Sequence, residues 1–188
     1  MNTRRFTILH SNDMHGDFLA EVSGAEGKLV GGLSLLSSYI NRVREEQNNV
    51  IYAISGDMVQ GSVIDSEYKG ISTMEIMNYL APDVVTLGNH EFDFGAKRLA
   101  ELYASAGLPV LAANMSSRSG KKPALPNVSP FLVRDVRGVR VAVIGLTHPL
   151  IPGWFLPSGL DGLGMGFGFT LALMALGAVR EFLAEGTL

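Results

Sequence analysis

The sequence predicts an α/β fold in which parallel strands are covered by helices. Short apolar runs rich in β-branched residues alternate along the chain with segments whose apolar residues recur at helical spacing. Polar and ionisable side chains gather in the turns where three of these strands end. In an open α/β sheet, ligands bind in the crevice outside the carboxyl ends of the strands. The pattern therefore predicts a functional site at one end of the sheet.

Length and composition fit one domain, or a piece of a larger one. The chain has 188 residues, of which 47% are hydrophobic, so it can bury a core. A formal net charge of -3 and basic clusters of no more than two residues, such as Lys121-Lys122, argue against a nucleic-acid partner. Because there is no cysteine, a metal ion would be held by Asp, His, Asn or Glu. Met1 to Arg5 lack the apolar core of a signal peptide, so we expect a cytoplasmic protein, although a mature exported form would look the same.

The first part of the chain predicts two strands and two helices. Phe6 to His10 forms a strand, and Gly24 to Gly32 forms a flexible loop. Helical spacing of the apolar residues from Leu33 onward predicts a helix through about Glu46. A second strand, Val50 to Ile54, precedes a helix that begins at Ser72 or Thr73 and ends at Leu80.

The alternation continues through the middle of the chain. Asp83 to Leu87 is predicted to be a buried strand and Gly95 to Ala106 a helix. A short fourth strand covers Pro109 to Ala112. Ser116 to Val128 is rich in Ser, Gly, Lys and Pro, which is typical of a surface loop.

The carboxyl-terminal third is predicted to contain a hairpin and a helix. Pro130 to Asp135 and Val139 to Gly145 form two strands around a turn at Arg137-Gly138. Thr170 to Leu183 is predicted to be a helix. Gly162 to Val179 carries no charge, but five glycines interrupt it and no basic or aromatic residues bracket both ends. We therefore reject a membrane-spanning helix there.

The turns after the first two strands carry side chains that can bind a metal ion. Asp13 and His15 stand two residues apart, so on an extended backbone their side chains point the same way. Asp57 follows Gly56 at the end of the second strand, in the same relative place as Asp13. Because the carboxyl ends of parallel strands face one crevice, we expect these side chains to lie close together.

The turn after the third strand is the richest in polar groups. Asn89 offers an amide oxygen, His90 an imidazole that titrates near neutrality, and Asp93 a carboxylate that can orient that imidazole. The alternative is that Asn89 and Asp93 only cap the helix that follows. The candidate ligands combine oxygen atoms with one imidazole, a set that suits Zn, Mn, Fe or Mg, and they are Asp13, His15, Asp57 and Asn89.

Three ordered motifs carry a family resemblance. Asp13-x-His15, Gly56-Asp57 and Gly88-Asn89-His90-Glu91 resemble the first three blocks of the calcineurin-like metallophosphoesterases, and more narrowly the 5'-nucleotidase group. The resemblance covers about residues 6 to 147. It implies a double β-sheet sandwich flanked by helices in four layers, α-β-β-α, of which this chain would hold an incomplete part.

The resemblance also implies a role for each candidate residue. Asp13 and His15 would hold one divalent ion, Asp57 would bridge, and Asn89 would hold the second ion. His90 would stabilise the transition state or protonate the leaving oxygen, with Asp93 fixing its tautomer. The two ions, Zn, Mn or similar, would activate a hydroxide that attacks a nucleotide or another small phosphate ester.

The sequence departs from the family after the third motif. The family has a further histidine, then a Gly-His-x-His or Gly-His-x-Gln block, and a separate nucleoside-binding domain. Besides His15 and His90 this chain has only His10 and His148, and neither falls at a family ligand position. We expect residues 1–188 to form the amino-terminal portion of one such domain, with low or no activity alone. We also expect self-association, or pairing with a chain that supplies the missing half.

A second class of function explains the same missing ligands. The chain could be a non-catalytic α/β binding or interaction module whose metal site has eroded. The coding sequence downstream separates the two hypotheses, because a truncated enzyme should be followed there by a histidine after an apolar strand and then Gly-His.

Overall fold

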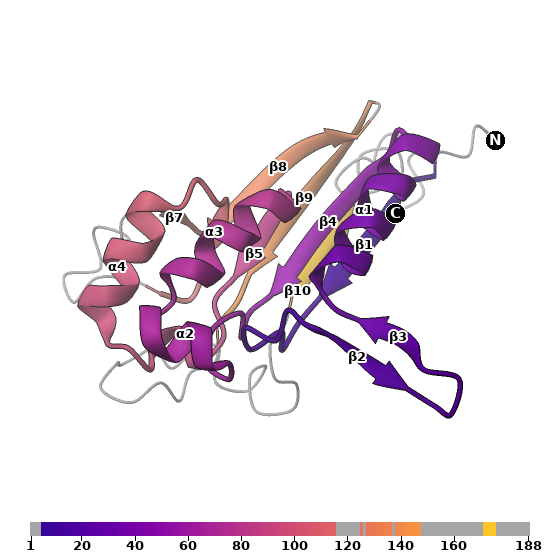
Figure 1. Ribbon diagram of the computed structural model, residues 1–188. Coiled ribbons are helices and arrows are strands. Elements are labelled where there is room, and N and C mark those ends of the chain that lie inside the picture. Colours follow the sequence, from indigo (N-terminus) through magenta and orange to yellow (C-terminus); the bar gives the residue numbers. More distant parts are fainter. Residues whose placement is uncertain (1–4, 116–124, 126, 137, 148–170, 176–188) are drawn as a thin grey trace, which may run out of the picture.

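The computed structural model describes residues 5–115, 125, 127–136, 138–147 and 171–175. Helices cover one face of a five-stranded sheet, and a three-stranded sheet lies against its other face (Figure 1). The predicted α/β class is confirmed. Of the four layers that the resemblance implied, the described residues supply one helix layer and both sheets.

The larger sheet is parallel throughout. Its strands are rich in Val and Ile, and five of the six residues of β4 are buried, as expected for a strand covered on both faces. Each strand pairs in parallel with its neighbours, in the order β1 (Thr7–Ser11), β4 (Val50–Ser55), β5 (Val84–Thr86), β6 (Val110–Leu111) and β7 (Val128–Ser129). The predicted strands are confirmed to within one or two residues, while β7 was not predicted.

Three predicted helices are confirmed and two short ones were missed. The confirmed helices are α1 (Leu33–Glu46), α3 (Ile71–Leu80) and α4 (Ala96–Ser105). The missed ones are α2 (Val63–Tyr68) and the 3-10 helix η1 (His90–Phe92). At six and three residues, neither is long enough to show a helical stripe of apolar residues.

The smaller sheet is antiparallel and closes the second core. Its strands are β8 (Phe131–Val136), β9 (Val139–Gly145) and β10 (Leu171–Ala175), in the order β10-β9-β8. The predicted hairpin is confirmed, with Val136 opposite Val139 at its closed end.

Alternation along β4 separates the two cores. Tyr52 and Ile54 belong to the core beneath the helices. Ile51 and Ala53 point the other way and pack with Val141 and other residues between the sheets. Period-two alternation of side chains therefore lets one strand supply both cores.

The flexible loop predicted for Gly24 to Gly32 is wrong. Ala20–Ser23 (β2) and Lys28–Gly31 (β3) pair as an antiparallel hairpin that extends away from the sheets (Figure 1). Gly24 and Gly27 both have positive φ, 74° and 64°, in the turn between the strands. The glycines that suggested flexibility thus serve a defined turn.

The helix predicted over Thr170 to Leu183 is also wrong where the structure describes it. Leu171–Ala175 is a strand, β10, antiparallel to β9. Leu, Ala and Met favour helices, but the edge of β9 offers unpaired backbone groups that a neighbouring strand can satisfy. The rest of that segment, and most of the predicted surface loop at 116–128, lie outside the described residues.

The ends of β6 and β9 are tied together by a buried asparagine. Asn114 Nδ2 donates to the backbone carbonyl of Thr147 at 2.7 Å, and Asn114 Oδ1 accepts from the Thr147 backbone N–H at 3.0 Å. Ala113 N also donates to the Gly145 carbonyl at 2.7 Å. Because β6 and β9 belong to different sheets, these bonds fix one sheet against the other.

Replacing Asn114 with Ala should lower the free energy of unfolding by about 2 kcal/mol, because two buried backbone groups lose their partner. The measurement is urea unfolding followed by circular dichroism. Asn41→Ala on the exposed side of α1 is the matched control and should change stability by no more than about 0.5 kcal/mol. Equal effects of the two substitutions would contradict the role of Asn114.

Candidate metal centre

Three loops converge at the carboxyl ends of β1, β4 and β5. Backbone bonds pair the first two loops like short strands: Asp13 N donates to the Gly56 carbonyl at 3.3 Å, and His15 N donates to the Asp57 carbonyl at 2.9 Å. The pairing continues from Gly16 N to the Met58 carbonyl at 2.8 Å. Together these bonds bring His15 beside Asp57.

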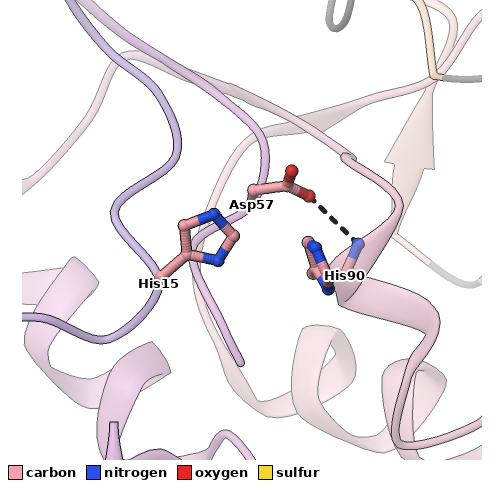
Figure 2. Close-up of side chains that lie close together, drawn as sticks. All are labelled: His15, Asp57 and His90. Atoms are coloured by element: carbon pink, nitrogen blue, oxygen red, sulfur yellow. Dashed lines mark hydrogen bonds between the residues drawn. The ribbon is translucent and has the colours of Figure 1, made fainter. Parts of the chain in front are cut away.

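The third loop completes a cluster of three side chains. Figure 2 shows His15, Asp57 and His90 facing one another. Each offers one ligand atom, and these atoms lie within 4.8 Å of one another. The two imidazole rings meet edge to face, with centroids 5.0 Å apart and an interplanar angle of 74°. Two imidazoles and one carboxylate are a donor set that fits Zn, Mn or Fe, so the residues present suit a divalent ion.

Asp57 is the most buried member of the cluster, with 2% exposure. Its Oδ1 accepts from the His90 backbone N–H at 3.0 Å, as the dashed line in Figure 2 marks. Burial raises the pKa of the Asp57 carboxyl. Gly88 leaves the space for this carboxylate, because a Cβ there would collide with it. A divalent cation beside Asp57 would favour the charged form that burial disfavours.

Each imidazole in the cluster is held through its Nδ1 atom. His15 Nδ1 lies 2.8 Å from the Gln60 carbonyl oxygen, and His90 Nδ1 lies 2.7 Å from Asp93 Oδ2. A carbonyl oxygen only accepts, so His15 must donate from Nδ1, and Nε2 is the ring atom that could bind a metal ion. The bond with Asp93 is the main cause of the raised pKa of His90.

The other predicted ligands lie at the margin of the cluster. Asp13 Oδ1 is 3.9 Å from His15 Nε2, and the Asp13 side chain is 45% exposed. Asn12 Nδ2 donates to the other carboxylate oxygen of Asp13. Asn89 is half-buried and immediately precedes His90. The structure thus brings His15 and Asp57 together with His90, for which we predicted a catalytic role, while Asp13 and Asn89 stand next to them in the chain.

The capping alternative for the third turn finds no support. Asn89 begins η1 without making a side-chain cap, and α4 begins after Gly95, also without one. Asp93 instead bonds to His90. Of the other histidines, His10 is exposed on β1, and His148 lies outside the described residues.

Sequence reasoning missed Glu91, which was quoted in the third motif without a role. The side chain is buried, with 1% exposure. Its Oε2 accepts from Asp57 N at 3.0 Å and Gly88 N at 2.5 Å, and its Oε1 accepts from Met58 N at 2.7 Å. Burial raises the pKa of Glu91 to about 7. The only signal of its burial in the sequence was its place next to the apolar Phe92. Spacing alone does not reveal that two loops converge on Glu91.

The chain is similar to several proteins described as 5'-nucleotidases. The 5'-nucleotidase of Rattus norvegicus is 34% identical over 157 residues, covering 78% of this chain and 27% of that protein. Snake venom 5'-nucleotidase of Naja atra is 34% identical over 156 residues, covering 78% of this chain and 29% of that protein. The crystal structure of a 5'-nucleotidase precursor from Thermus thermophilus has a TM-score of 0.68 at 29% identity, covering 95% of this chain and 34% of that one. This chain therefore spans only a minor part of their length.

A second, separate match covers the end of the chain. The model of the family described as Rnf-Nqr subunit, membrane protein, matches residues 139–188. None of the helices among the described residues combines the length and hydropathy that a membrane crossing needs. The structure has β10 within this segment, whereas the match is to a membrane protein, so the two findings do not agree there. Most of the segment for which we rejected a membrane helix lies outside the described residues.

A family match also covers the site itself. The model of the calcineurin-like phosphoesterase family matches residues 6–134, which is more than half of the chain. That range contains β1, β4 and β5 and all three loops that bring His15, Asp57 and His90 together. The named relatives are 5'-nucleotidases, in agreement with the narrower resemblance of the motifs. The chain belongs to the calcineurin-like phosphoesterase family.

Proposed function

We propose that this chain is the amino-terminal portion of a 5'-nucleotidase-like, metal-dependent phosphoesterase domain that acts on nucleotides or similar small phosphate esters. The observation that carries the proposal is the convergence of His15, Asp57 and His90 from three separate loops, with ligand atoms within 4.8 Å of one another. The similarity to proteins described as 5'-nucleotidases supports the substrate class.

Four side chains would hold two divalent ions. Asp13 and His15 would serve the first ion, Asp57 would bridge, and Asn89 would serve the second. When bound, such ions supply Lewis acidity to a phosphoryl group and lower the pKa of water. Asp57 suits the bridging role because it is the most buried member of the cluster. Its Oδ1 accepts from His90 N, and its Oδ2 does not take part in that bond.

His90 and Asp93 would move a proton. Asp93 holds His90 at Nδ1 and favours the protonated ring, which leaves an N–H at Nε2. That N–H can donate to a phosphate oxygen or to the leaving oxygen of the ester. The bond also fixes the ring plane, so the proton is held in one direction.

This chain covers only part of the length of its relatives. It spans 27% of the rat protein, so we propose that residues 1–188 lack the later ligand blocks and the nucleoside-binding domain and hydrolyse esters poorly or not at all alone. Self-association, or pairing with a chain that supplies those parts, is the accompanying proposal. The exposure of Leu19, Val22 and Leu29 along the hairpin, at 75%, 68% and 60%, supports it.

The cytoplasmic location expected from the sequence stays a prediction. One relative is described as a snake venom 5'-nucleotidase, which supports the alternative of a mature exported form.

Removing the negative charge of Asp57 should weaken metal binding. Asp57→Asn keeps an acceptor for His90 N but loses the negative charge, so we expect the affinity for Zn²⁺ to fall at least about tenfold. Isothermal titration calorimetry on the metal-free chain measures this. Glu21→Ala on the exposed face of β2 is the control and should leave the affinity unchanged. If wild type binds no Zn²⁺, the non-catalytic module with an eroded site becomes the better hypothesis.

Asp93→Asn should lower the pKa of His90, because the carboxylate bond is the main cause of its elevation. The measurement is an NMR titration of the imidazole in the metal-free chain, compared with Glu101→Gln on the exposed face of α4. A His90 midpoint that is the same in wild type and Asp93→Asn would remove Asp93 as the partner of that ring.

Glu91 should make the metal-free chain less stable as pH rises. The pKa of this acid is about 7 when folded, against an ordinary value of 4.5, so the folded state binds the proton more tightly. Its contribution to stability is complete below the ordinary value and is lost as pH rises through about 7. Between pH 5 and pH 9 we expect the loss of about 2 kcal/mol of unfolding free energy, measured with urea.

Glu91→Gln should remove that part of the pH dependence, whereas Glu75→Gln on the exposed face of α3 should keep it. An unchanged slope in Glu91→Gln would show that other groups carry the effect.

A further inference from the structure

Asp65 is a buried carboxylate that lies outside the cluster. It belongs to α2 and is 0% exposed. Among the described residues, no basic side chain forms an ion pair with it. Its oxygens are used separately: Oδ2 accepts from Gln60 N at 2.5 Å, and Oδ1 accepts from Thr73 Oγ1 at 2.6 Å. A carboxylate buried in this way is unfavourable unless such bonds compensate for lost water.

Gln60 links Asp65 to the cluster through its backbone. Its φ is 69°, a left-handed conformation that a residue with a side chain rarely adopts. The Asp65 carboxylate holds the Gln60 N–H, and the Gln60 carbonyl accepts from His15 Nδ1 at 2.8 Å. Both backbone polar groups of this strained residue are therefore engaged, one on each side.

The loop around Gln60 packs directly against the His15 backbone. A Cβ at Gly61 would lie 2.6 Å from the His15 carbonyl oxygen and 2.8 Å from its Cβ. A Cβ at Gly16 would lie 2.8 Å from Ser62 Oγ and 3.1 Å from Asp65 Cβ. The loop that holds Gln60 is therefore in direct contact with the loop that holds His15. A rotation of the Gln60 peptide would turn the Gln60 carbonyl away from His15 Nδ1.

We propose that Asp65 is a positioning residue that acts through the Gln60 backbone to keep the His15 proton on Nδ1 and so present Nε2 to the metal site. The buried Asp65 carboxylate holds the strained Gln60 peptide, and the Gln60 carbonyl accepts a hydrogen bond from His15 Nδ1. His15 Nε2 then faces the cluster. The metal-binding part of this inference rests on the proposed function, whereas the tautomer of His15 can be measured without a metal.

A purely structural role for Asp65 predicts a different result. Asp65 lies in the first turn of α2, where a carboxylate is favourable, and its buried side chain accepts two hydrogen bonds, so its loss would lower stability in any case. Loss of stability therefore does not test the inference. The protonation site of one imidazole does, because helix stability alone does not move it.

The experiment is ¹⁵N NMR of the histidine imidazoles in the metal-free chain, at a pH where the rings are neutral, followed by calorimetric titration with Zn²⁺. Wild type should show His15 protonated at Nδ1. Asp65→Ala should show a mixture of tautomers, because Gln60 is released, and its affinity for Zn²⁺ should fall about 10- to 100-fold.

Two variants separate positioning from stability. Asp65→Asn can still accept from Gln60 N and can donate to Thr73 Oγ1, so it should resemble wild type in both measurements. Thr73→Val removes only the bond at Oδ1, so it should lower stability but leave the tautomer unchanged. Glu67→Ala, which removes an exposed charge from the same helix, controls for the loss of a negative charge.

The outcomes distinguish this inference from the proposed function. A folded Asp65→Ala variant with the wild-type tautomer of His15 would overturn the inference. A Thr73→Val variant that shifts the His15 tautomer as far as Asp65→Ala does would also overturn it. If the tautomer responds as expected while wild type binds no Zn²⁺, the positioning role stands and the proposed metal function fails.

Discussion

The site depends on one buried carboxylate beneath it. Glu91 accepts hydrogen bonds from the backbone of Asp57, Met58 and Gly88, and so joins the loop after β4 to the loop after β5. The arrangement has a cost, since burial raises the pKa of Glu91 to about 7. An apolar side chain would avoid that cost but would leave three buried N–H groups without an acceptor. Glu91 therefore holds the two loops in a fixed geometry beneath the site.

Backbone strain also indicates that contacts between these loops fix their geometry. Asp13, His15 and Asp57 all have positive φ, of 51°, 49° and 51°. Residues with side chains hold such conformations only where their surroundings determine them. Here the loops after β1 and β4 determine each other, through bonds such as His15 N to the Asp57 carbonyl. Contacts between the loops thus fix the backbone of these residues, and side-chain bonds such as His15 Nδ1 to the Gln60 carbonyl then orient the rings.

Much of this arrangement could be predicted from the sequence, because Asp13 and Asp57 follow parallel strands and topology alone brings them to one edge. Asp65 and Glu91 could not be assigned roles. Both side chains accept from backbone N–H groups, Glu91 from Asp57 and Asp65 from Gln60, and no pattern of residue types marks a backbone partner. The error in the fold at Leu171–Ala175 has a related origin, since its composition is helical but the open edge of β9 decides its structure. At Glu91 and at Leu171–Ala175, a contact distant in the sequence outweighs what is visible locally.

The two histidines of the cluster show how neighbours assign different chemistry to one residue type. His15 donates from Nδ1 to a backbone carbonyl, so Nε2 is the atom that could bind a metal ion. His90 bonds to the Asp93 carboxylate, which raises its pKa and favours the doubly protonated ring. A ring whose Nδ1 is bonded to a carbonyl can offer Nε2 to a metal ion, and a ring that keeps its proton suits an acid. The partners of His15 and His90 therefore support the division of roles proposed from the motifs, even though both imidazoles lie within reach of one ion.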